Sequence, residues 1–250
     1  MDRLWPVSGA PQVNDDVEDF YRYPRALRRP WVRVNFVSSL DGAVTLEGSS
    51  RGLSAPEDQR VLGLIRDLSD VILVGVGTAM AEGYRGVKRT EVRGERRSRH
   101  GLSEVPPIAL VTRSAALPPD SPLLTDTLVP PIVLTCEAAP PERRAALADA
   151  GADVVVTGDR EVDLRAALDA LDARGLRRVG CEGGPRLFGT LVAADLVDEL
   201  CLTMSPLLVA GDAGRIANGP GVTVPQRMRL ESVLHTDESL LLLRYARMPR

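Results

Sequence analysis

The 250-residue sequence has little of the chemistry that marks secreted, metal-binding or membrane proteins. Its three cysteines, Cys136, Cys181 and Cys201, are far apart and form no Cys-x-x-Cys pair, which disfavours a disulfide framework or a metal site and fits a cytoplasmic location. No apolar run approaches roughly 18 residues, so we expect no membrane span. The net charge of −3 provides no overall basic field, so we expect no nucleic-acid partner.

Common nucleotide-binding and deaminase motifs are also missing. Gly75-Val76-Gly77 follows an apolar segment, but Met80 stands where the third glycine of the dinucleotide fingerprint belongs. Nothing matches the P-loop pattern, and the paired His-x-Glu and Pro-Cys-x-x-Cys signature of zinc deaminases is absent. These absences disfavour an ordinary doubly wound dehydrogenase, a P-loop NTPase and a zinc deaminase.

Short apolar segments alternate with amphipathic ones along the chain. The alternation predicts an α/β domain with a mostly parallel central sheet, helices on both faces and a C-terminal antiparallel hairpin. The expected strands cover residues 31–37, 71–75, 108–111, 132–134, 154–156, 178–182, 199–205, 229–234 and 240–245. One helix is expected to begin after Ser54, which would be its N-cap, and a short one after Gly75. Further helices are expected over residues 141–150 and 164–171, and a last one begins at Pro185. We expect one domain over residues 29–250, after an irregular N-terminal arm of residues 1–28.

Residues 84–106 form a polar run that is rich in arginine. A run of this kind predicts a solvated surface loop. Arg85 and Arg89 are nearest the preceding helix and are the best placed to bind a phosphate. The other arginines of the run are Arg93, Arg96, Arg97 and Arg99.

The junction Glu182-Gly183-Gly184-Pro185 is the most informative stretch. An apolar strand is expected to end at Glu182, where open α/β sheets bind ligands, and a helix to begin at Pro185. The two glycines let the backbone approach a ligand closely, and the free N–H groups of the new helix suit a phosphate. Glu182 is our candidate for a substrate contact. Two other interpretations remain open: an ordinary strand–turn–helix junction, and a buried acid that pairs with an arginine to fix the turn.

A second anion site is expected after the strand at residues 108–111. Thr112, Arg113 and Ser114 follow that strand at the ligand edge of the sheet. Arg113 and Ser114 could hold the 2′-phosphate that distinguishes NADPH from NADH. The alternative for Arg113 is a solvated loop arginine.

The motifs in combination resemble a known family. They are Ser39-Leu40-Asp41-Gly42, Gly75-Val76-Gly77-Thr78, Thr112-Arg113-Ser114, Glu182-Gly183-Gly184-Pro185-x-Leu187 and the run from Asp195 to Glu199. Together they resemble the reductase domain of the bifunctional riboflavin-biosynthesis deaminase-reductases and its stand-alone archaeal and fungal relatives. The resemblance covers roughly residues 29–246 and implies a dihydrofolate-reductase-like fold. It also implies NADPH-dependent reduction of 5-amino-6-(5-phosphoribosylamino)uracil to the ribitylamino product, with hydride transfer to ribose C1′.

The resemblance assigns roles to matching positions. The positions that contact NADP in the family are Val37, Gly52, Thr78, Glu82, Gly184, Pro185, Arg186, Leu187, Phe188, Gly189 and Thr190, with Gly183 beside them. The positions that contact substrate are Ser50, Arg66, Arg89 and Glu182, and Asn35 faces the substrate. The chain departs from the family at Glu82, where Asp is usual, and at Gly83-Tyr84-Arg85-Gly86, which lacks the usual Asp-Pro. Arg85 is therefore a further candidate for the substrate phosphate.

Three functions remain open at this point. The first is the riboflavin-pathway pyrimidine reductase, expected to be a cytoplasmic homodimer. The second keeps the fold and NADPH but reduces dihydrofolate or another pterin, as the altered loop at residues 82–86 and the missing deaminase domain suggest. The third is a non-catalytic nucleotide-binding protein that uses the arginines of residues 93–99 on a partner or on RNA.

Overall fold

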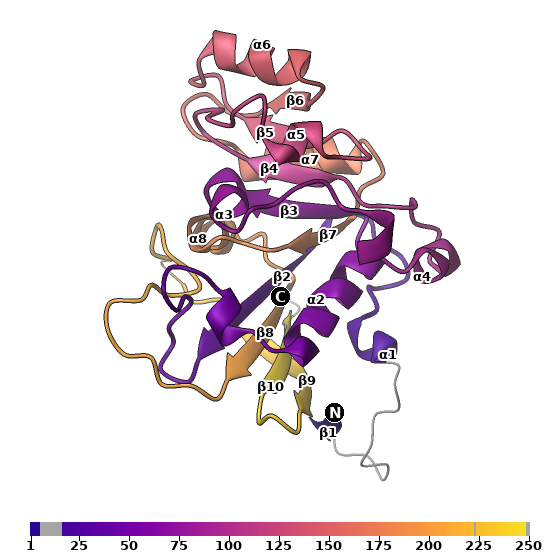
Figure 1. Cartoon of the computed structure of the whole chain (residues 1–250), viewed down its shortest axis with the longest axis vertical. Coiled ribbons are helices and arrows are strands. Elements are labelled where there is room, and N and C mark those ends of the chain that lie inside the picture. The colour runs from indigo at the N-terminus through magenta and orange to yellow at the C-terminus, as the bar shows by residue number, and fades with distance from the viewer. Residues whose placement is uncertain (6–16, 223, 249–250) are drawn as a thin grey trace.

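The computed structural model describes residues 1–5, 17–222 and 224–248. The described residues form a single ten-stranded sheet in the order β1-β9-β10-β8-β2-β7-β3-β4-β5-β6 (Figure 1). The strands are β1 (Asp2–Trp5), β2 (Trp31–Ser39), β3 (Val71–Gly75), β4 (Ile108–Val111), β5 (Ile132–Thr135), β6 (Asp153–Val156), β7 (Arg178–Cys181), β8 (Glu199–Ser205), β9 (Met228–His235) and β10 (Leu241–Arg247). The helices are α1 (Glu18–Tyr21), α2 (Pro56–Leu68), α3 (Val76–Ala81), α4 (Gly94–Arg99), α5 (Pro122–Thr125), α6 (Pro141–Asp149), α7 (Leu164–Asp172) and α8 (Pro185–Ala193), with 3-10 turns at Arg51–Leu53 and Arg89–Glu91.

Parallel pairing runs from β8 through β2, β7, β3, β4 and β5 to β6. The remaining strands are antiparallel, since β10 pairs with both β8 and β9, and β9 pairs with β1. The predicted fold class, a mostly parallel sheet closed by a C-terminal antiparallel hairpin, is therefore confirmed. Because β2, β7, β3 and β8 all run in the same direction, their carboxyl ends meet at one edge of the sheet.

Helices cover both faces of the sheet, as predicted. On one face, α7 and α8 bury a core with β2, β7, β3, β4 and β5, in which Leu171, Leu187 and Leu191 pack against Val34 and Leu73. On the other face, α3, α5 and α6 pack on the β3–β5 half, and α1 and α2 pack on β8, β9 and β10.

The N-terminal segment is more regular than the irregular arm that the sequence predicted. Strand β1 adds to the edge of the sheet beside β9, and α1 packs against α2 with Glu18 and Tyr21 buried. The signal was weak because both elements are only four residues long. Residues 6–16 of the predicted arm, and residues 249–250 of the predicted domain, lie outside the described residues.

Two local predictions were wrong. Ser54 does not cap α2, because Ala55 occupies the N-cap position and the Ser54 hydroxyl donates instead to Asp58. The arginine run is not a solvated loop, because α4 forms within it and buries Arg96 and Arg97. Arg97 donates to the carbonyl oxygens of Arg66 and Ser69, both at 2.8 Å, and so satisfies acceptors at the C-terminal end of α2.

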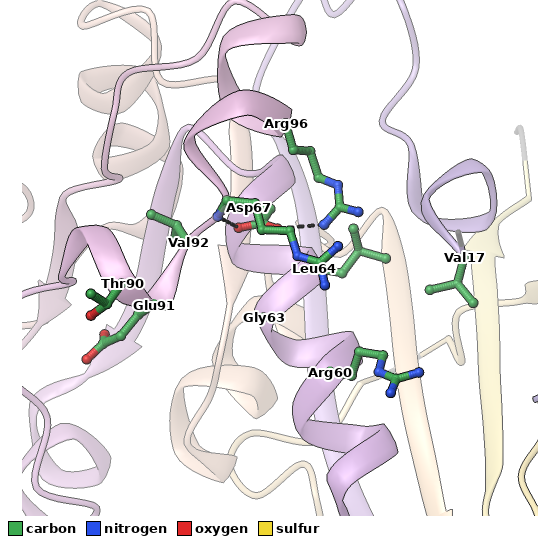
Figure 2. Close-up of a pocket in the computed structure, with 10 residues that line it drawn as sticks. Val17, Arg60, Gly63, Leu64, Asp67, Thr90, Glu91, Val92 and Arg96 are labelled. Atoms are coloured by element: carbon green, nitrogen blue, oxygen red, sulfur yellow. Dashed lines mark hydrogen bonds and ion pairs between the residues drawn. The ribbon is translucent and has the colours of Figure 1, made fainter. Parts of the chain in front are cut away.

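Arg96 lines a cavity of about 230 Å³ on the outer side of α2 (Figure 2). Its guanidinium points at Asp67 and donates to Oδ2 at 2.7 Å, and it also donates to Glu18 at 2.8 Å. Arg99 donates to the same Glu18 carboxylate at 3.0 Å. These arginines hold α1, α2 and α4 together; Arg96 and Arg97 are buried, whereas Arg93 and Arg99 are exposed.

No helix among the described residues is long and apolar enough to cross a membrane.

Candidate active site

The Gly183–Gly184 junction packs directly against the turn that follows the neighbouring strand β3. The N–H of Gly75 donates to the carbonyl oxygen of Gly183 at 2.8 Å, and the peptide bond between Gly183 and Gly184 is cis. A Cβ atom added at Gly183 would lie 2.7 Å from the Phe36 ring, and one at Gly184 would lie closer than 3.0 Å to Thr78 Oγ1. The packing around both positions therefore requires glycine, so the pair is more than an ordinary turn between a strand and a helix.

Helix α8 begins immediately after this junction, with Gly184 as N-cap and Pro185 in its first turn. The Phe188 N–H donates to the Gly184 carbonyl and starts the hydrogen-bond ladder. Helix geometry therefore leaves the N–H groups of Arg186 and Leu187 without partners within the helix. These groups, together with the positive end of the helix dipole, suit a phosphate.

A cavity of about 430 Å³ opens in front of the junction. Many of the residues that the sequence analysis singled out line it: Asn35, Val37, Ser50, Arg66, Thr78, Glu82, Glu182, Gly184 and Pro185. They come from β2, the loop after it, α2, α3 and the β7–α8 junction, which are far apart in sequence. The fold thus brings the predicted cofactor and substrate positions to one cavity at the carboxyl edge of the sheet.

Glu182 forms a buried cluster with Arg66 and Tyr84 at this cavity. Arg66 donates to both carboxylate oxygens, from Nε at 2.7 Å and from Nη2 at 2.8 Å, and the Tyr84 hydroxyl donates to Oε2 at 2.5 Å. The side chain of Glu182 is 4% exposed and that of Arg66 is 20% exposed. Burial and the adjacent carboxylate raise the pKa of Tyr84 well above its usual range, so this phenol stays protonated at neutral pH. This geometry matches the alternative interpretation of Glu182, in which the acid pairs with an arginine. Arg66, Tyr84 and Glu182 all line the cavity.

Glu82 anchors the loop that follows β2. Its carboxylate accepts from the Ser50 backbone N–H at 3.1 Å, the Ser50 hydroxyl at 3.0 Å and the Ser49 hydroxyl at 3.1 Å. Gly52 lies just beyond, in a neighbouring hollow that it shares with Leu46 and Glu82. The Glu82 side chain therefore fixes the loop that carries Ser50.

The two arginines predicted for a substrate phosphate lie outside the lining of this cavity. Arg85 pairs with Glu91 at 3.1 Å, and Arg89 pairs with Glu104, both at the surface. Their charges are already balanced by these carboxylates, and a phosphate must displace those partners to reach them.

The residues after β4 and those further along α8 also lie beyond the cavity lining. Arg113 pairs with Glu161 at 2.8 Å on the surface, and Thr112 is buried beside exposed Ser114. In α8, Leu187, Phe188 and Gly189 are buried, whereas Arg186 and Thr190 are exposed. Phe188 stacks on Phe36 with ring centroids 5.3 Å apart, which ties α8 to β2.

Tyr84 and Asp58 are among the side chains of the cavity lining that sequence reasoning missed. Asp58, Leu62 and Arg66 follow one another at intervals of four in α2, so they share one face of the helix. That spacing was the available signal. Tyr84 had none, because the loop that carries it departs from the family pattern.

The fold and the cavity define an α/β protein in which a helix N-terminus that suits a phosphate lies beside a cavity lined by carboxylates and arginines. Comparisons with known proteins agree with this class. The model of the RibD C-terminal domain family matches residues 30–242, so the chain belongs to that family.

Two curated relatives are stand-alone proteins named 2,5-diamino-6-ribosylamino-4(3H)-pyrimidinone 5′-phosphate reductase. The chain is 32% identical to the one from Archaeoglobus fulgidus, over 84% of this chain and 95% of the relative. It is 34% identical to the one from Methanothermobacter thermautotrophicus, over 81% of this chain and 91% of the relative. Among solved structures, a pyrimidine reductase-like protein from Corynebacterium diphtheriae superimposes with a TM-score of 0.77 at 26% identity, covering 88% of this chain and 93% of that one.

A reductase of this family implies a nicotinamide cofactor, and the residues at the junction fit one. Gly184 lines the cavity beside Thr78, and Gly183 packs against the Phe36 ring, so the chain can turn tightly into α8 at the cavity wall. The start of α8 supplies unpaired N–H groups beside it. The same cavity continues to Glu182, Arg66 and Asp58 and so leaves room for a second ligand.

Proposed function

We propose that this protein is an NADPH-dependent reductase of a ribosylaminopyrimidine 5′-phosphate in riboflavin biosynthesis. The observation that carries the proposal is that one cavity joins the glycine junction to the Arg66–Glu182–Tyr84 cluster, in a chain that belongs to the RibD C-terminal domain family. The first of these features suits a dinucleotide phosphate and the second suits a polar heterocycle or sugar.

When bound, the cofactor supplies a hydride to C1′ of the ring-opened ribosylamine. The protein's own residues position the reactants, which must come within about 3–3.5 Å of each other. In this proposal Gly183, Gly184 and the start of α8 hold the pyrophosphate, and Thr78 and Val37 lie against the rest of the cofactor. The remaining α8 positions support that site from behind.

Glu182 acts in this proposal by orienting Arg66 and Tyr84. Its charge is balanced by the bidentate guanidinium, so it stabilises a developing cation less than an unpaired carboxylate does. Arg66 keeps further N–H groups to donate, and the Tyr84 oxygen keeps lone pairs that can accept. Both therefore can bind substrate from fixed positions, with Asn35 and Ser50 nearby in the cavity.

We infer that NADPH is preferred over NADH through Arg113 and Ser114, which follow β4 at the same edge of the sheet. Arg85 and Arg89 remain candidates for the substrate phosphate, once released from Glu91 and Glu104. We further propose a cytoplasmic homodimer built from a single reductase domain of residues 29–250, with residues 1–28 as its N-terminal extension.

A second candidate function is reduction of dihydrofolate or another pterin. It is favoured by Tyr84, an aromatic side chain that lines the cavity at a place where the loop departs from the family pattern.

A steady-state assay of NADPH oxidation separates the two candidate functions. We expect turnover with 5-amino-6-(5-phosphoribosylamino)uracil or with the 2,5-diamino-pyrimidinone for which the curated relatives are named, and little with dihydrofolate. Faster turnover of dihydrofolate than of either pyrimidine would refute the first function.

A further inference from the structure

The face of β8, β10, β9 and β1 that points away from α1 and α2 is apolar and is largely left out of the cores that the described residues form. Helices α1 and α2 lie on the opposite face of these strands, where Cys201, Leu234 and Leu242 are buried (Figure 1). Successive side chains of a strand point to opposite sides, so the residues between these point away from both helices. On β8, Leu200 still packs against the core of α7 and α8, whereas Leu202 belongs to none of the three cores. The cover that α7 and α8 provide therefore ends at this strand.

Strand register arranges the side chains of this face in three rows. In the middle row, Leu243 on β10 lies between Leu202 on β8 and Val233 on β9, and the next member is Trp5 on β1. Residues opposite each other in antiparallel strands point to the same side of the sheet. The neighbouring rows are Met204, Leu241, His235 and Asp2 on one side, and Leu200, Tyr245 and Leu230 on the other. We call these three rows the open face; an acid and a histidine stand at one corner of it, and the rows contain no lysine or arginine.

Large apolar side chains are exposed on the open face and at its margins. Trp5 is 47% exposed, and Leu4, at the register shift before it, is 50% exposed. Leu207 and Leu208 follow directly after β8 and are 39% and 80% exposed. Apolar surface of this extent marks an interaction site, because the side chains gain free energy when a partner removes them from water.

The size of the open face is close to that of a small dimer interface. Four strands about 4.8 Å apart, with rows about 7 Å apart, give roughly 20 Å by 20 Å, or about 400 Å² in projection. The accessible surface of a corrugated face exceeds its projection, so with the exposed leucines it approaches the roughly 600 Å² per partner at the low end of stable interfaces. Strand β1 supplies about a quarter of the width.

The charge of the open face and the course of the chain favour a second copy as the occupant. Residues 6–16 connect β1 to Val17, and Val17 is buried with α1 and α2 on the opposite face of the sheet. Rows almost free of charge offer little to a charged partner, whereas an identical apolar face complements them across a two-fold axis.

We propose that two copies of the chain pack sheet against sheet through the open face, with Trp5 of the N-terminal strand as an anchor at its edge. This inference rests on the homodimer of the proposed function and assigns its interface. The family model matches residues 30–242, so β1 and Trp5 lie outside the matched region. Tryptophan is enriched among the few residues that dominate interface energies, because it buries a large rigid surface. Strand β1 therefore widens the interface and gives the first residues of the chain a role in assembly.

The test measures mass in solution for the wild-type protein and two variants. Sedimentation equilibrium and light scattering at micromolar concentrations should give twice the mass of one chain for the wild type. Leu243→Glu places a charge at the centre of the open face and should raise the dissociation constant of the dimer about 100-fold or more. Trp5→Ala removes the edge anchor and should raise it about tenfold or more.

Leu128→Glu is the matched control, because Leu128 is also an exposed leucine, at 50%, but stands in none of the three rows. It should leave the dissociation constant unchanged. If Leu243→Glu does not fold, Trp5→Ala still decides, since Trp5 is half exposed at the sheet edge. A wild-type protein that stays monomeric, or a dimer that neither Leu243→Glu nor Trp5→Ala weakens, overturns the proposal. A dimer weakened by Leu243→Glu alone refutes the part assigned to β1.

The interface and the proposed reaction fail in different ways. A monomeric wild-type protein that oxidises NADPH with a pyrimidine substrate overturns the interface and leaves the reaction standing. A dimer that the two variants weaken as expected, but that oxidises NADPH with neither pyrimidine, supports the interface and refutes the reaction.

Discussion

Replacing Gly184 by alanine is the most direct perturbation of the proposed cofactor site. A Cβ atom at this position would come closer than 3.0 Å to Thr78 Oγ1 and within 3.3 Å of Thr78 Cβ. Thr78 is held in α3 and its branched side chain has few alternative rotamers. The overlap must therefore be relieved by movement of the junction or of α3. Overpacking of this kind costs about 1–3 kcal/mol, equivalent to a fall in melting temperature of roughly 4–8 °C for about 2 kcal/mol in a chain of this size.

The same substitution should also weaken cofactor binding. Relief of the overlap must displace Thr78 or the start of α8, which both line the cavity, so we expect the dissociation constant for NADPH to rise at least about tenfold, measured by calorimetry. Gly63→Ala is the matched control, because a Cβ atom there meets nothing within 4 Å and Gly63 lies in α2 away from the junction. Alanine at that helical position should leave NADPH affinity unchanged and stabilise the fold by about 0.5–1 kcal/mol.

A double-mutant cycle tests the proposed cause of the effect. Thr78→Ala removes the hydroxyl that the new Cβ atom would meet, so the double variant should recover about 1 kcal/mol of the stability that Gly184→Ala loses. Strict additivity of the two changes would show that Thr78 is not the obstacle. Wild-type stability and wild-type NADPH affinity in Gly184→Ala would refute the reasoning about the junction itself.

Three further predictions concern other parts of the chain. Glu182→Gln breaks a buried pair with Arg66, so turnover should fall about 10- to 100-fold and stability by about 2–3 kcal/mol, with NADPH affinity near wild type in a fluorescence titration. Tyr84→Phe removes one hydrogen bond to a carboxylate and should lower kcat/KM about tenfold and stability by about 1.5–3 kcal/mol, with a corresponding fall in melting temperature. Burial favours a higher pKa for Glu18, but hydrogen bonds from His100 and Arg96 hold it at about 2. Glu18→Gln should therefore cost about 2 kcal/mol at neutral pH in urea unfolding, and the difference should shrink as the pH falls from about 4.5 towards 2. A constant difference across that range would contradict the assignment.

The fold was predictable because its strands are short apolar runs separated by glycine and proline. The segments around Val71–Gly75 and Glu199–Ser205, for example, were read with the bounds that the structure has. The burial of Arg96 and Arg97 was not predictable in this way. Their partners are Glu18, Asp67 and the carbonyl groups at the C-terminal end of α2, which are all far away in the sequence. A local sequence pattern cannot predict such contacts.

The candidate site was predictable only in part, for a related reason. The glycine junction has a local signature, and its carboxylate was identified from its place at the end of a strand. The partner of Glu182 is Arg66, which is 116 positions away, and the sequence left open whether the acid contacts substrate or fixes the turn. Asp58 could be placed only by reading its spacing of four with Leu62 and Arg66 along α2, and only the folded structure shows that this face of the helix lines the cavity.

The central claim is that this cavity brings a reduced nicotinamide to the C1′ carbon of a ribosylaminopyrimidine phosphate. Incubation of the protein with NADPH deuterated on the transferable position of the nicotinamide, and with each pyrimidine substrate in turn, tests it directly. We predict that mass spectrometry and proton NMR of the ribitylamino product will find one deuterium on C1′. A product without deuterium at that carbon, or label transferred only to dihydrofolate, would contradict the account.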